Sequence, residues 1–69
     1  MSTNNQLIIK RRTKGKNKWD IYENPCVYNE FKYNKENKLK TENSLIQAIR
    51  WCQKYMTENI VEYGYYVIE

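Results

Sequence analysis

The chain has 69 residues and a net charge of +4, which is enough for one small domain that buries only about 60% of the surface its unfolded form exposes. No apolar run approaches the ~18 residues of a membrane-spanning helix, and residues 1–6 form a polar tail without the features of a secretory signal. We therefore expect a single domain over residues 1–69, located in the cytoplasm and without a membrane partner.

The first strand is predicted at residues 7–12, which begin with a Leu-Ile-Ile run and continue into basic residues. A turn follows at residues 13–17. It contains Gly15 and Asn17, which tolerate the positive φ that a tight hairpin requires. The pattern predicts a β-hairpin with a basic tip.

The second strand is predicted at residues 18–23, where Trp19 and Ile21 alternate with polar residues as in a half-buried strand. Pro25 ends it, because proline lacks the backbone donor that a sheet ladder needs. Residues 26–33 are interpreted as a third strand.

A polar linker is predicted at residues 34–38, followed by an amphipathic helix at residues 44–56. Either Thr41 or Ser44 can cap its start. The helix presents one apolar stripe, so it must pack against the strands. We expect Leu45, Ala48, Ile49, Cys52 and Met56 to face Leu7, Ile9, Trp19 and Ile21, with Trp51 and Tyr55 as further packing residues.

The helix has two candidate ends, Asn59 and Gly64. We choose Gly64, because glycine is favoured just after a helix and Ile60 and Tyr63 extend the stripe. Residues 65–68 then form a last strand that returns to the sheet. The sequence predicts an α+β fold of order β-β-β-α-β, with a small three- to four-stranded antiparallel sheet packed on one helix.

Charge is unevenly distributed along the chain. Residues 1–40 contain ten Lys or Arg against four Asp or Glu, whereas residues 41–69 contain two against four. Residues 10–18 alone hold six cations and no acid, a pattern that indicates a surface for phosphates or for an acidic partner. These cations are Lys10, Arg11, Arg12, Lys14, Lys16 and Lys18.

The residues that most enzymes depend on are missing from this sequence. There is no histidine to act as a base, and the only glycines, Gly15 and Gly64, cannot form a phosphate-binding loop. Cys26 and Cys52 are too far apart for a close metal-binding pair, and we expect both to be free thiols. We therefore expect no enzyme activity, catalytic residue, cofactor, metal or small-molecule substrate.

Aromatic residues beside lysines on a sheet can stack on exposed bases, and Trp19 and Tyr22 are candidates for this role. Strand alternation predicts that one sheet face points away from the helix. The residues expected there are Ile8, Lys10, Arg12, Lys18, Asp20 and Tyr22.

A family resemblance is carried by Lys10-Arg11, Gly15-Lys16, Trp19, Lys40-Thr41, Ala48 and Trp51. In this order they resemble the AP2-like, arm-binding DNA domain at the N-terminus of phage and transposon integrases. The resemblance covers about residues 8–56 and implies a three-stranded sheet that enters the DNA major groove. It implies that Lys10, Arg12, Lys14, Lys16, Lys18 and Asp20 face DNA. The chain departs from the family because no recombinase domain follows and residues 65–69 add a strand.

Two functions fit these observations. The first is a small basic domain that binds DNA or RNA, with the hairpin at residues 10–18 contacting phosphates. The alternative is a small interaction or inhibitor protein, of the kind found in phages and mobile elements, that docks on an acidic surface of a larger protein. Both use the same cations together with Trp19 and Tyr22.

Overall fold

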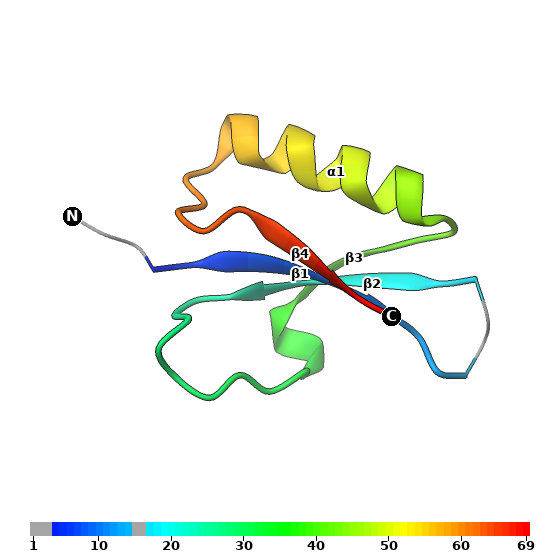
Figure 1. Ribbon diagram of the computed structural model, residues 1–69, viewed down its shortest axis with the longest axis horizontal. Helices are drawn as coiled ribbons and strands as arrows, with labels where there is room; N and C mark the ends of the chain where they lie inside the picture. The colour runs from blue at the N-terminus through cyan, green and yellow to red at the C-terminus, as the bar shows by residue number, and fades with distance from the viewer. Residues whose placement is uncertain (1–3, 15–16) are drawn as a thin grey trace.

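A four-stranded sheet with one helix on one face forms the domain (Figure 1). The computed structural model describes residues 4–14 and 17–69. Its elements are β1 (Gln6–Arg11), β2 (Trp19–Asn24), the 3₁₀ helix η1 (Lys35–Asn37), β3 (Lys38–Glu42), α1 (Leu45–Glu58) and β4 (Tyr65–Ile68). The predicted order β-β-β-α-β is confirmed. In these described ranges, no helix has the length and hydrophobicity that crossing a membrane requires.

The third strand lies later in the chain than predicted. Residues 26–33 form a loop, and β3 occupies Lys38–Glu42, which begins at the last residue of the predicted linker. The backbone of the loop forms hydrogen bonds outside the strand ladder of the sheet. The N–H of Val27, for example, donates to the carbonyl of Asn4 at 2.8 Å. Its rings pack on Tyr22 instead of extending the sheet. The prediction failed because apolar residues in a covering loop resemble those of a strand.

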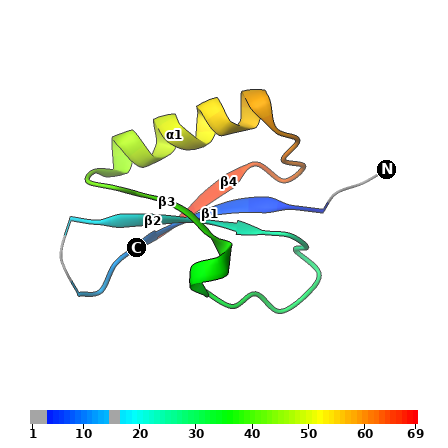
Figure 2. The same cartoon turned by 180° about the vertical axis from the view of Figure 1, so that it is seen from behind.

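The sheet has the order β3-β2-β1-β4, and β4 runs parallel to β1. The other two pairs are antiparallel, so the expectation of an all-antiparallel sheet is corrected. The helix explains the difference. It carries the chain back along the sheet after β3, and β4 therefore runs in the direction of β3 and β1. Figure 2 shows this crossover from behind.

The helix starts at the second of its two predicted caps. The hydroxyl of Ser44 accepts a hydrogen bond from the N–H of Gln47 at 3.1 Å, which satisfies one donor of the first turn. Thr41, the other candidate, lies in β3.

The helix ends at Glu58, so the choice of Gly64 was wrong. The side chain of Asn59 donates to the carbonyl of Tyr55 at 3.1 Å and closes the last turn. The following chain is held by Asn5, whose side chain bonds the carbonyl of Ile60 at 2.8 Å and the N–H of Glu62 at 2.9 Å. These bonds join residues more than 50 positions apart, and no local pattern encodes them.

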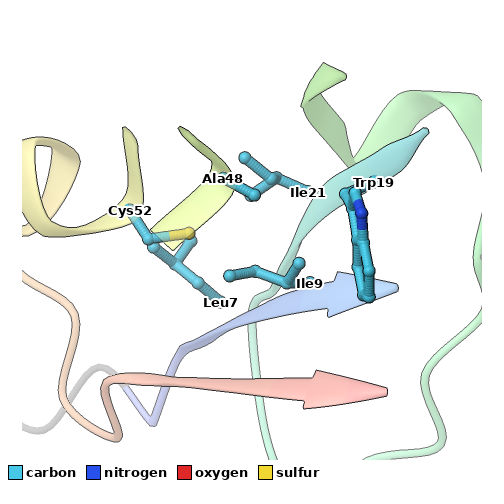
Figure 3. Close-up of a cluster of buried hydrophobic side chains, with 6 residues drawn as sticks. All are labelled: Leu7, Ile9, Trp19, Ile21, Ala48 and Cys52. Atoms are coloured by element: carbon cyan, nitrogen blue, oxygen red, sulfur yellow. The ribbon is translucent and has the colours of Figure 1, made fainter. Parts of the chain in front are cut away.

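The core lies between α1 and the sheet, as predicted (Figure 3). Its buried members are Leu7, Ile9, Trp19, Ile21, Ala48 and Cys52. Further side chains on α1 are partly buried against them; these include Leu45, Ile49, Trp51, Tyr55 and Met56. The ring of Trp51 stacks on Tyr55 with centroids 5.2 Å apart.

Candidate nucleic-acid interface

The basic hairpin joins β1 to β2 at one end of the sheet. The ladder pairs Lys10 with Asp20 and Arg11 with Trp19, and the N–H of Arg12 donates to the carbonyl of Lys18 at 3.0 Å. In the turn, Asn17 adopts a φ of 63°, a conformation that asparagine tolerates better than most residues. Lys14 is exposed, whereas the predicted site residue Lys16 lies outside the described residues.

Arg12 is bound to the protein itself. Its guanidinium donates to the carboxylate of Asp20 at 2.7 and 3.1 Å, and Asp20 also accepts from the hydroxyl of Thr41 at 2.7 Å. Lys38 lies 3.9 Å from the same carboxylate. Burial by itself raises the pKa of Asp20. The hydrogen bonds and the nearby cations lower it by a larger amount, so the pKa lies below its usual value. The carboxylate therefore stays charged and neutralises Arg12.

Lys10 and Arg11 lie on opposite sides of β1 and each approaches an aromatic ring. The ammonium of Lys10 is 5.5 Å from the ring centroid of Tyr33, and the guanidinium carbon of Arg11 is 5.7 Å from that of Trp19. Neither side chain forms an ion pair with another residue of the described ranges. The rings hold these cations in place and leave their charge available.

A shallow hollow of about 300 Å³ opens beside these cations. It is lined by Lys10, Arg11, Arg12, Thr13 and Glu69. Because Arg12 is paired with Asp20, two available cations stand against the carboxylate of Glu69. The hollow therefore keeps a net positive charge, which suits a small anionic group such as a phosphate oxygen.

The start of the helix adds to the positive character of this end. The ammonium of Lys18 donates to the side-chain oxygen of Asn43, in the short turn before α1. Glu42 pairs with Trp19 in the sheet, which places the N-terminus of α1 near the hairpin. The helix dipole contributes a partial positive charge there. Sequence reasoning did not identify Asn43 or this contribution, because both depend on where β3 lies.

The sheet face opposite the helix is not the open basic surface that the sequence predicted. The loop between β2 and η1 crosses it, as both views of the chain show (Figures 1 and 2). Ile8 and Asp20 are buried, and Tyr22 contacts Phe31 and Tyr33 edge-on at 6.1 and 5.2 Å. Burial raises the pKa of both tyrosines.

The two rings that were predicted to stack on bases are also inaccessible. Trp19 is 8% exposed and Tyr22 is 9% exposed, because one lies in the core and the other lies under the loop. The structure therefore corrects the expectation that these rings stack on bases. Two cations that the sequence analysis left out, Lys38 and Lys40, lie on β3; the alternation in Lys-Leu-Lys-Thr-Glu could have revealed them.

No protein-family model, curated protein or solved structure matches this chain. The resemblance to AP2-like domains thus rests on the quoted residues. Of the DNA-facing set that it implies, Arg12 and Asp20 bind one another. Lys10, Lys14 and Lys18 gather at the hairpin end.

Proposed function

We propose that this protein is a small nucleic-acid-binding domain that contacts phosphates through its β1–β2 hairpin. The observation that carries the proposal is the gathering of cations at one end of the 38 Å long axis (Figure 1). The cations Lys10, Arg11, Lys14 and Lys18 lie at the hairpin end, and none of them forms an ion pair in the described part of the chain.

Three carboxylates, those of Glu23, Glu58 and Glu62, lie toward the other end of the molecule, whereas those of Asp20, Glu42 and Glu69 lie near the hairpin. Glu23 pairs with Leu7 near the start of β1, and Glu58 is the last residue of α1. Glu62 bonds the backbone of Asn4 in the same region. A molecule with this charge distribution orients its hairpin toward a polyanion and its acidic end away from the polyanion.

The proposed contact is to the phosphate backbone. The tip cations sit on a protruding turn, and the buried rings offer no stacking platform for bases. Phosphate contacts position a protein without reading the sequence. We therefore expect binding to DNA or RNA with little preference among sequences.

The proposal is tested by fluorescence anisotropy with a labelled duplex over a series of salt concentrations. Four phosphate contacts give a slope of about −3.6 in log K against log salt, which is a loss of about a hundredfold between ~50 and ~200 mM. The double variant Lys14→Glu, Lys18→Glu should abolish binding. Circular dichroism would confirm that it remains folded.

The matched control is Arg50→Glu with Lys54→Glu, which makes the same change in net charge on the exposed face of α1. This variant should keep most of the affinity. Equal losses in the two double variants would refute a contact through the hairpin.

The burial of Trp19 and Tyr22 favours a second candidate function. Without open rings, the hairpin end offers only cations, and cations also suit an acidic surface on another protein. No binding to DNA or RNA at ~50 mM salt, with protein in the micromolar range, would favour this alternative.

A further inference from the structure

The two edges of the sheet differ in how they are protected. Edge strands usually carry charges or bulges that prevent pairing with another chain. β3 has both: its residues are Lys38, Leu39, Lys40, Thr41 and Glu42, and its register with β2 shifts between Ile21 and Tyr22. β4 is Tyr-Tyr-Val-Ile, without charge, proline or a shift. In the described ranges, no strand pairs with its outer edge.

The pairing of β4 with β1 determines which of its backbone groups point outward. The N–H of Leu7 donates to the carbonyl of Gly64 at 2.9 Å, so the backbone groups of Gly64 point toward β1. Successive residues of a strand direct these groups to alternate sides. The N–H and C=O groups of Tyr65 and Val67 therefore lie on the open edge.

We propose that a second copy of this chain pairs antiparallel with this edge, along β4. In an antiparallel pair, two opposed residues exchange both of their hydrogen bonds. Opposing Tyr65 with Val67 of the partner subunit satisfies the outward groups of both strands through four hydrogen bonds. Tyr66 then lies opposite Tyr66 of the partner subunit, on the two-fold axis.

Side-chain packing agrees with this register. Tyr65 and Val67 point to the core side of the sheet but stay only half-buried at its rim. Across the two-fold axis, Tyr65 would lie opposite Val67 of the partner subunit. An aromatic residue opposite a β-branched residue is a favourable cross-strand pair. Opposed residues share a face of the sheet, so both helices lie on the same side of a continuous sheet.

Charge favours a second copy of this chain as the partner. β4 starts just after Glu62, at the acidic end, and finishes with Ile68 paired to Lys10, at the hairpin end. An antiparallel pair therefore places the hairpin end of each copy beside the acidic end of the other. Glu69 of each copy falls opposite Tyr63 of the partner subunit, so no like charges are directly opposed.

One consequence rests on the proposed function. The two-fold axis passes through Tyr66, whose neighbour in β1 is Ile8, and Lys14 lies six residues further along. At ~3.4 Å per residue, the two hairpin tips are at most about 40 Å apart along the strands. One turn of duplex DNA is ~34–36 Å, so both hairpins can contact one duplex a turn apart.

The test measures mass by light scattering after gel filtration, from micromolar to millimolar protein. The wild type should approach twice the 8.5 kDa mass of the chain. Tyr66→Lys and Tyr66→Glu should each be monomeric, because like charges meet on the axis. An equimolar mixture of the two variants should regain the dimer mass.

The matched control is Ile46→Lys, which adds the same charge at an exposed residue of α1 and should leave the dimer intact. Val67→Pro is a second way to break the interface, since it removes an outward N–H and leaves the donors that face β1. A wild type that is monomeric at millimolar concentration, or dimeric Tyr66 variants, would overturn the proposal. A dimer that binds neither DNA nor RNA would refute the proposed function and leave this interface standing.

Discussion

The strongest test of the fold is the substitution Ile21→Ala in the centre of the sheet. Ile21 is 0% exposed and lies in β2, with β1 and β3 on either side and Ala48 of α1 in the same cluster. The strands on either side leave little room for the backbone to close the space left behind. We therefore expect most of the cavity to remain.

The expected loss can be estimated from the atoms removed. Ile to Ala deletes three methylene-sized groups, worth ~0.8 kcal/mol each, and the cavity adds about 1 kcal/mol. The free energy of unfolding should fall by about 3 to 4 kcal/mol. A chain of this length is stable by only about 3 to 10 kcal/mol, so the variant should lose at least about a third of its stability.

Urea denaturation followed by circular dichroism measures this loss. The matched control is Ile46→Ala on α1, since Ile46 is 63% exposed and alanine is the better helix former. Its stability should change by less than about 0.5 kcal/mol. Similar losses in the two variants, or a loss below about 1 kcal/mol for Ile21→Ala, would show that this cluster is not the core.

Three further predictions concern a carboxylate, the thiols and a turn. The pKa of Asp20 is raised by burial but lowered more by Arg12 and its other partners, so its charge stabilises the fold above the usual aspartate range. This contribution disappears as pH falls through the lowered pKa, and thermal melts of Asp20→Asn should depend less on acid pH than those of the wild type. Burial raises the pKa of Cys52 to about 12, so iodoacetamide at neutral pH should alkylate Cys26 in the native protein and Cys52 only after denaturation, as mass spectrometry can show. Gly64 has a φ of +68°, and Gly64→Ala should cost about 1 kcal/mol in a urea titration even though nothing lies within 4 Å of the added carbon; no loss would mean that the turn relaxes.

Local patterns in the sequence were sufficient to predict the helix, the hairpin and the core residues. The apolar stripe of α1 repeats with the helical period, and Trp19 and Ile21 alternate with the period of a strand. Both periods follow from backbone geometry within a few residues. For that reason the facing core residues were also predicted correctly.

The candidate site was only partly visible in the sequence. The run of cations at residues 10–18 is local, so its place on a hairpin could be predicted. Whether each cation is available could not be predicted. The charge of Arg12 is neutralised by Asp20, whose carboxylate also accepts a hydrogen bond from Thr41 on the neighbouring strand β3. Likewise, Tyr22 is covered by a loop whose residues were predicted to form a strand.

Tertiary structure alone decided the third strand, the end of the helix and the direction of β4. Each depends on partners distant in the chain: Asn5 holds the segment after α1, and β1 receives β4 as a parallel neighbour. Hydrogen bonds of this kind form only when the chain has already folded back on itself. The sequence by itself determined which segments are periodic and where charge collects, whereas long-range bonding decided which edges, faces and cations remain exposed.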